Sequence, residues 1–175
     1  MSSIIFSKDD CDFIKSYWDD TKSLNGSKRD YYKIDEINTI SYNRKVSGYY
    51  IDYDDTTLLN FVLNKLQKID IKSITGSHVK IAKYIKGDYF EPHHDFNFYG
   101  KGAIYKTLVI QLSDPTEYVG GNFCVKGIAQ SREQGSYSLF LSSDIHEVKL
   151  LESGTRFSMT IFLYESDFTH KKSII

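Results

Sequence analysis

The sequence is poor in the residues that build several common kinds of protein. It has 2 cysteines, Cys11 and Cys124, and 2 prolines among 175 residues. Two distant cysteines are too few for a disulfide scaffold or a cysteine-based zinc site, and two prolines exclude a proline-rich linker. A metal site in this chain would therefore rest on histidine and carboxylate.

An excess of charge of one sign and a long apolar run are also missing. The 22 Lys and Arg and the 23 Asp and Glu residues give a formal net charge of −1. This balance argues against nucleic acid or an anionic membrane surface as a partner. No apolar run approaches the roughly 20 residues of a membrane span, and no secretory signal begins the chain. We therefore expect a cytoplasmic protein with reduced cysteines, whose oligomeric state the composition leaves open.

The sequence does contain enough apolar and aromatic residues for one folded domain. Hydrophobic residues make up 41% and aromatic residues 15% of the chain. This composition excludes global disorder, and the length fits a single domain over residues 1–175. Within it, we expect residues 1–76 to form supporting helices and strands and residues 77–168 to form a β-rich core.

Two amphipathic helices are predicted in the N-terminal part. Ser7 is a typical N-cap with Asp10 three residues later, and apolar residues follow at helical spacing. Trp18 ends this apolar pattern, and we assign it to the core rather than to a ligand site. A second helix is predicted from Asp55 or Thr56 to about Gln67, where apolar residues recur with a period of 3.6.

Short alternating runs, separated by Gly, Asp, Ser and Pro, dominate the chain from Val79 onward. They cover residues 78–85, 104–112, 121–126, 137–141, 147–151 and 156–164. This pattern is typical of a β-sandwich or barrel, so the predicted class is α+β, mainly β, with helices supporting an antiparallel core. We interpret Gly154 as a hairpin turn that pairs the strand of His146 with the strand of Arg156.

The last of these runs separates polar from apolar side chains. Arg156, Ser158 and Thr160 share one face, and the odd-numbered residues from Phe157 to Leu163 share the other. If the apolar face packs outward against the helices, the polar face lines the barrel, where it needs a polar ligand. The alternative is an ordinary amphipathic strand with Arg156 in solvent.

Two histidines and one aspartate form a candidate metal site. On an extended chain, His93 and Asp95 point to the same side, whereas His94 points away and is interpreted as a non-ligand. A lone His-x-Asp also occurs in surface turns, so a third ligand is needed. His146 supplies one, which completes a set of two histidines and one carboxylate. Ten residues later, Arg156 offers a bidentate fork for a carboxylate.

Several short motifs follow one another in a fixed order. They are Tyr84-x-x-Gly87, Pro92-His93-x-Asp95, Leu112-Ser-Asp-Pro, Tyr118-x-Gly120-Gly121, Gly135-Ser136, Leu139-Phe140, His146-x-Val148, Gly154-x-Arg156 and Ser158. With them, the chain from about His78 to Phe168 resembles the Fe(II)/2-oxoglutarate-dependent oxygenases, most closely the prolyl 4-hydroxylase-like group. The Leu-Ser-Asp-Pro stretch is also similar to bacterial iron-regulated hydroxylases of the same superfamily.

The resemblance implies a double-stranded β-helix, a jelly-roll or cupin-like core, in which His93, Asp95 and His146 bind Fe(II). It implies 2-oxoglutarate as cosubstrate, O₂ as oxidant and ascorbate as a candidate further ligand. In such enzymes, decarboxylation of 2-oxoglutarate to succinate and CO₂ accompanies hydroxylation of a side chain. We expect this ligand set to face solvent in the metal-free protein.

The resemblance also assigns residues to the cosubstrate. Arg156 would pair with the distal carboxylate of 2-oxoglutarate, with Ser158 and Tyr84 contacting the same molecule. Gln111 stands where many relatives carry a tyrosine, and an amide would replace the phenol there. The turn Gly120–Gly121 would bring the backbone close to the pocket.

The substrate and even the class of function stay open at this point. One hypothesis is a hydroxylase of a protein or peptide side chain, with proline favoured, or of a free amino acid or small metabolite. The other is a β-helix that binds metal or ligand without catalysis. All three ligands and Arg156 are present, which favours the first. The tyrosine-rich residues 31–53 would line a peptide groove or form half-buried strands, and Asn38–Tyr49 is the candidate for a mobile loop over the substrate.

Overall fold

The computed structural model describes residues 4–18, 24–26, 30–34, 38–42, 44–50, 56–67, 69, 75–95 and 104–164. Its helices are α1 (Lys8–Lys15), α2 (Thr56–Leu66) and the 3-10 turn η1 (Pro115–Glu117). Its strands are β1 (Leu24–Gly26), β2 (Asp30–Ile34), β3 (Asn38–Tyr42), β4 (Arg44–Tyr50), β5 (Thr75–Ile85), β6 (Tyr89–His93), β7 (Ile104–Gln111), β8 (Tyr118–Gly120), β9 (Phe123–Val125), β10 (Ile128–Ala129), β11 (Tyr137–Leu141), β12 (His146–Val148) and β13 (Leu151–Tyr164). Across these residues, neither helix has the length and apolar character that a membrane crossing requires.

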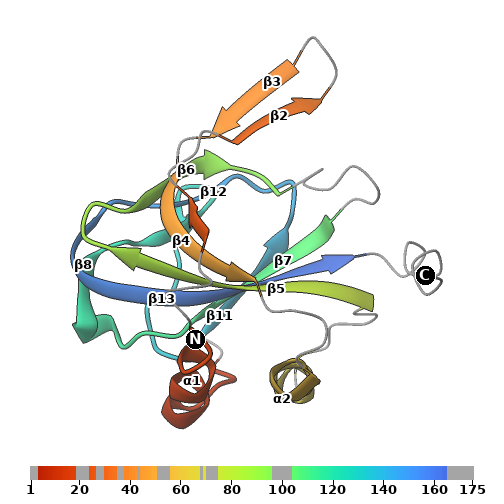
Figure 1. Cartoon of the computed structure of the whole chain (residues 1–175), viewed down its shortest axis with the longest axis vertical. Coiled ribbons are helices and arrows are strands. Elements are labelled where there is room, and N and C mark those ends of the chain that lie inside the picture. The colour runs from red at the N-terminus through yellow and green to blue at the C-terminus, as the bar shows by residue number, and fades with distance from the viewer. Residues whose placement is uncertain are drawn as a thin grey trace.

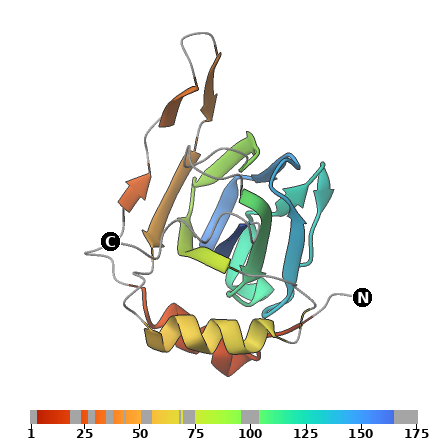
Figure 2. The same ribbon diagram turned by 90° about the vertical axis from the view of Figure 1, so that its right-hand side faces the viewer.

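A single curled antiparallel sheet forms the body of the molecule. Its strand order is β10-β9-β12-β6-β4-β5-β13-β7-β11, with β1 added beside β4 and β8 beside β13. The sheet curls around an interior, and the separate β2–β3 hairpin projects from it on the side away from the helices (Figures 1 and 2). This arrangement confirms the predicted class, a mainly β jelly-roll with supporting helices.

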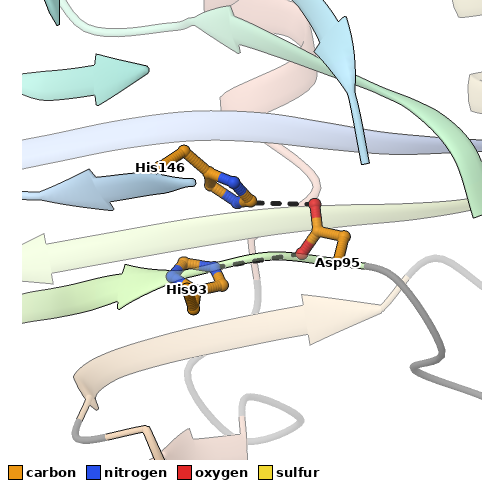
Figure 3. Close-up of side chains that lie close together, drawn as sticks. All are labelled: His93, Asp95 and His146. Carbon is orange, nitrogen blue, oxygen red and sulfur yellow. Dashed lines mark ion pairs between the residues drawn. The ribbon is translucent and has the colours of Figure 1, made fainter. Parts of the chain in front are cut away.

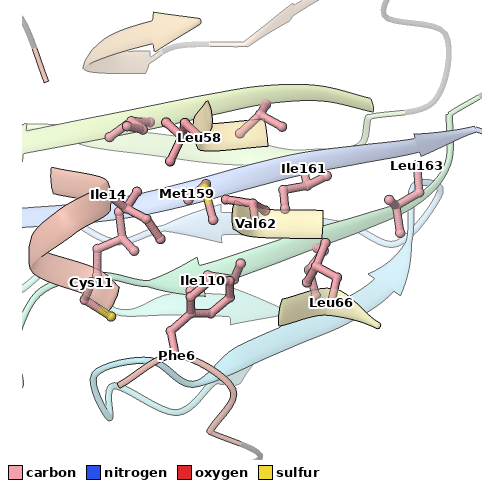
Figure 4. Packing of buried hydrophobic residues seen from close by; sticks show 14 residues of the cluster. Phe6, Cys11, Ile14, Leu58, Val62, Leu66, Ile110, Met159, Ile161 and Leu163 are labelled. Atoms are coloured by element: carbon pink, nitrogen blue, oxygen red, sulfur yellow. The ribbon is translucent and has the colours of Figure 1, made fainter. Parts of the chain in front are cut away.

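The two helices cover the outer face of the sheet. As predicted, Ser7 caps α1: its hydroxyl accepts from the Asp10 amide, and the Asp10 carboxylate accepts from the Ser7 amide. Lys65 of α2 forms an ion pair with Asp10 at 2.6 Å, which joins the helices. The apolar face of β13 packs against both of them in one cluster (Figure 4). Its buried members are Phe6, Cys11, Ile14, Leu58, Val62, Leu66, Val79, Ile81, Leu108, Ile110, Leu112, Met159, Ile161 and Leu163.

Because the odd-numbered side chains of β13 point outward, its even-numbered side chains point into the curled sheet. Arg156 and Ser158 are both buried there, so the alternative with Arg156 in solvent is wrong. Trp18 packs against the outer cluster and meets the Phe157 ring edge-on, which confirms its assignment to the core.

The hairpin predicted at Gly154 is wrong. Leu151–Tyr164 is one continuous strand, and β12 pairs with β6 and β9 rather than with β13. Gly154 has a φ of +79°, and a Cβ there would lie 2.1 Å from the Glu117 carbonyl oxygen. The glycine therefore permits the close approach of β8 to β13, after which β13 continues between β5 and β7.

The tyrosine-rich stretch adopts strands where the structure describes it. Asn38–Tyr42 is β3 and Arg44–Tyr50 is β4, so a loop over Asn38–Tyr49 is not observed in these ranges. β4 pairs with β5 and β6 and thereby becomes part of the main sheet. Tyr53, the last residue of the predicted groove, lies outside the described ranges.

Candidate metal centre

His93, Asp95 and His146 come together at one end of the interior. His93 ends β6, Asp95 follows it by two residues, and His146 opens β12 directly opposite His93. Asp95 Oδ1 lies 3.9 Å from His93 Nε2, and Asp95 Oδ2 lies 3.4 Å from His146 Nε2 (Figure 3). The three potential ligand atoms lie within 4.8 Å of one another, a spacing that suits one metal ion.

Both imidazoles are held by the backbone in the same way. His93 Nδ1 lies 2.8 Å from the Glu91 carbonyl oxygen, and His146 Nδ1 lies 2.9 Å from the Asp144 carbonyl oxygen. A proton on each Nδ1 satisfies these contacts and leaves each Nε2 lone pair facing Asp95. The rings are thus preset in the tautomer that a metal ligand needs.

The triad is buried, so the expectation that it faces solvent is wrong. Its three residues are only 4–5% exposed. The Phe90 ring stacks on His93 with centroids 3.6 Å apart, and the Phe140 ring lies 4.7 Å from His146. Burial, reinforced by His146, holds the pKa of His93 well below its usual value. His93 therefore stays neutral, which is the form that binds a metal.

A second polar group lies deeper in the interior, around Arg156. Arg156 is 1% exposed and donates from Nη2 to Gln111 Oε1 at 2.8 Å and from Nη1 to Ser158 Oγ at 3.4 Å. The Tyr84 ring lies 5.2 Å from its guanidinium carbon, and burial raises the pKa of the Tyr84 phenol, which stays protonated. The four residues predicted to contact the cosubstrate thus form one cluster, because β13 pairs Arg156 with Tyr84 and Ser158 with Gln111.

Within the part of the chain that the structure describes, no counter-charge lies in the Arg156 cluster. Among the described residues, no carboxylate forms an ion pair with Arg156, and its buried Nε has no hydrogen-bond partner. A buried, uncompensated guanidinium is costly, and an entering carboxylate would remove that cost through a bidentate contact. The donor set of the triad fits Fe(II), and Arg156 fits the distal carboxylate of a keto diacid.

Gly121, in the β8–β9 turn, lies close to the Arg156 side chain. Its φ is +61°, and a Cβ there would lie 2.5 Å from Leu151 Cδ1 and 3.4 Å from Arg156 Cδ. The sequence predicted that the backbone at Gly120–Gly121 comes close to the cosubstrate residues. In the structure, Gly121 makes this approach, next to Arg156.

Replacing Gly121 by alanine is expected to lower the free energy of unfolding more than the same change at Gly127. Gly127 has a similar φ of +76° with nothing near its Cβ position, so Gly127→Ala costs only the backbone strain, about 1–2 kcal/mol. Gly121→Ala adds overpacking against Leu151, about 1–3 kcal/mol more. Urea denaturation of both variants measures the difference, and equal losses would contradict the packing argument.

Two contacts at the centre involve residues that the sequence reasoning missed. The Asp95 amide donates to the Ser142 carbonyl at 2.8 Å, and Thr107 Oγ1 donates to Asp95 Oδ2 at 2.6 Å. Thr107, Val109 and Gln111 alternate on the interior face of β7, so the period of two that placed Gln111 also points to Thr107. Nothing local in the sequence marks Ser142.

A curled sheet that buries two histidines and an aspartate, together with an arginine that has no carboxylate partner in the described ranges, is typical of non-haem metal proteins with a site for an acidic ligand. Residues 79–164 match the family model of the 2OG-Fe(II) oxygenase superfamily. The β-core of this chain therefore belongs to that superfamily, which confirms the resemblance seen in the motifs. The family implies Fe(II), 2-oxoglutarate and O₂.

Individual relatives point the same way. The chain is 27% identical over 150 residues to a PKHD-type hydroxylase of Prochlorococcus marinus, and the match covers 81% of this chain but 64% of that protein. A viral collagen prolyl hydroxylase of Paramecium bursaria Chlorella virus-1 superposes with a TM-score of 0.67 at 15% identity, covering 93% of each chain. A prolyl hydroxylase of Trichoplax adhaerens, solved with a hypoxia-inducible-factor peptide, gives a TM-score of 0.55 at 17% identity, covering 74% of this chain and 67% of that one. At such identities, the two structures establish the fold.

Proposed function

We propose that this protein is an Fe(II)- and 2-oxoglutarate-dependent dioxygenase that hydroxylates a side chain. The single observation that carries the proposal is the buried Arg156, which has no carboxylate partner among the described residues, in the same interior as the His93–Asp95–His146 triad. A metal site alone fits many functions, whereas a metal site that shares its interior with a buried arginine favours a metal-chelating acid as its second ligand.

Each part of the chain has a role in this proposal. His93, Asp95 and His146 hold the metal, and Arg156 holds the distal carboxylate of the keto acid. Bound Fe(II) would activate O₂, of which one oxygen atom would go to the substrate side chain as a hydroxyl and the other to 2-oxoglutarate, which would become succinate and CO₂. Phe90 and Phe140 line the histidines with apolar surface, which limits the access of water to the centre.

Around Arg156, three residues complete the proposed cosubstrate pocket. Gln111 holds Nη2 of the guanidinium, Ser158 holds Nη1, and the protonated Tyr84 phenol offers a further donor. Residues 77–168 carry this chemistry in our proposal, and residues 1–76 support them.

Proline in a protein or peptide is the proposed target. The names of the hydroxylase from Prochlorococcus marinus and of the viral and Trichoplax enzymes support it. The chain spans about two thirds of the length of that Prochlorococcus relative, so the target is a proposal about the described core. A free amino acid or small metabolite remains the alternative substrate, and ascorbate and a cytoplasmic location remain predictions.

Release of succinate tests the reaction class. The purified protein is expected to form succinate from 2-oxoglutarate only when both Fe(II) and O₂ are present. Without O₂, adding Fe(II) and 2-oxoglutarate together is expected to produce a visible metal-to-ligand absorption band. A non-catalytic binding protein would show the band without succinate, and absence of the band would contradict the cosubstrate assignment. Mass spectrometry for a gain of 16 Da on proline-containing peptides and on free amino acids then separates the two substrate classes.

A further inference from the structure

Asp95 is the member of the triad that the sheet supports least. It lies two residues beyond the end of β6, where the strand ladder no longer fixes it. Its backbone keeps one cross-connection, the hydrogen bond from its amide to the Ser142 carbonyl. Its side chain has two rotatable bonds, so something besides the ladder must orient the carboxylate between the two imidazoles.

Thr107 makes that contact. Its Oγ1 donates to Asp95 Oδ2 at 2.6 Å, a charge-assisted hydrogen bond inside a fully buried environment. The hydroxyl is the side-chain donor seen at Oδ2, while the other carboxylate oxygen, Oδ1, lies 3.9 Å from His93 Nε2. The hydroxyl thus fixes one of the two carboxylate oxygens.

Thr107 itself is held rigidly. β7 lies between two neighbours, and Thr107 is opposite Phe140 on β11 and Phe162 on β13. As a β-branched residue, it also has few χ1 states in a strand. A donor fixed in this way can set the angle of the carboxylate before any ligand arrives.

We infer that Thr107 is a positioning residue for the metal centre, which holds Asp95 in the orientation that binds the metal. This inference rests on the proposed function, because it assumes that the triad is a metal site. Thr107 also shares the interior face of β7 with Gln111, which holds Arg156. Strand geometry of about 3.3 Å per residue puts their Cα atoms about 13 Å apart, so one strand supports both ends of the pocket.

Three variants separate the hydroxyl from the shape of the side chain. Thr107→Val keeps the shape without the donor, Thr107→Ser keeps the donor without the methyl group, and Thr107→Ala keeps neither. The probe is Mn(II) alone, whose free concentration is measured by electron paramagnetic resonance in titrations of the whole chain. Urea unfolding of each metal-free variant shows that it is folded.

Loss of the hydroxyl is expected to weaken Mn(II) binding by about 10- to 100-fold. Thr107→Val and Thr107→Ala should show this loss, while Thr107→Ser should bind like the wild type. If Thr107→Val does not fold, the comparison of Ser with Ala still isolates the hydroxyl, because both lack the methyl group.

The opposite pattern would overturn the inference. A purely packing role predicts that Thr107→Val binds Mn(II) normally and that Thr107→Ser is impaired, and unchanged binding in all three variants would equally exclude positioning by the hydroxyl. Failure of the proposed function is distinguishable, because it is read from succinate formation by the wild-type chain, whereas the inference is read from the Mn(II) affinities of the variants.

Discussion

Replacing His146 by alanine is expected to abolish succinate formation and to remove high-affinity Mn(II) binding. The change leaves two of the three protein ligands, His93 and Asp95, which are too few to hold the metal ion tightly. The loss should exceed the about 100-fold that marks the upper end for residues that only orient ligands. Mn(II) titration and a succinate assay measure the two effects separately.

The burial of His146 adds a second consequence, which a solvent-facing ligand would not have. His146 lies against the rings of Phe140 and Phe123, so alanine leaves a cavity there. We expect a loss of about 0.5–3 kcal/mol in the free energy of unfolding, within the usual range for single substitutions. Urea denaturation of the metal-free protein therefore accompanies the binding measurement and confirms that the variant is folded.

His94→Ala is the matched control for His146→Ala. His94 is adjacent to His93 in sequence but does not belong to the triad. Its removal should leave Mn(II) affinity unchanged. A His146→Ala protein that binds Mn(II) like the wild type would exclude His146 as a ligand.

The parts of the fold that follow from local rules could be predicted from the sequence. Ser7 with Asp10 is a self-contained cap, and the alternation from Arg156 to Leu163 assigns each side chain of β13 to a face whatever its neighbours are. Gly154 shows where such rules stop. A glycine between two alternating runs indicates a turn locally, but here it serves a contact with Glu117, 37 residues earlier in the sequence.

Some features of the site could likewise be predicted from local spacing, and others depend on how the sheet folds. The period of two placed Arg156 with Ser158, which share a face of β13, and His93 with Asp95, which continues the same extended segment just beyond β6. The residues that orient these side chains could not be predicted from the neighbouring sequence. Thr107 reaches Asp95, and Ser142 holds its backbone, only because the sheet curls and brings β7 and the β11–β12 turn to the end of β6. Burial of the triad was missed for the same reason, since Phe90 and Phe140 cover the histidines from different strands.

Replacing Arg156 by methionine is expected to weaken 2-oxoglutarate binding by about 2–5 kcal/mol, the cost of removing one partner of a buried charge pair. This corresponds to a factor of about 30 to 4,000 in the dissociation constant. Mn(II) binding should be unchanged, because the contacts of Arg156 are with Gln111, Ser158 and Tyr84 rather than with the triad. The affinity of Arg156→Lys for 2-oxoglutarate should lie between those of the wild type and Arg156→Met, since lysine keeps the charge but loses the planar fork. Anaerobic titration of 2-oxoglutarate into the Fe(II)-loaded protein measures all three affinities.

Arg156→Met should weaken 2-oxoglutarate binding without lowering the free energy of unfolding of the ligand-free protein. Arg156 is a buried cation without a carboxylate partner in the described structure, and methionine fills similar space without that desolvation cost. We expect the variant to unfold at the same or a higher urea concentration than the wild type.

Added metal and 2-oxoglutarate at about 100 times the dissociation constant should stabilise the wild type by about 2.7 kcal/mol and the variant much less. A residue kept for packing would give the reverse, a destabilised variant with normal affinity. Only a residue whose charge is retained for a ligand loses binding without losing stability, and that combination would assign Arg156 to the cosubstrate.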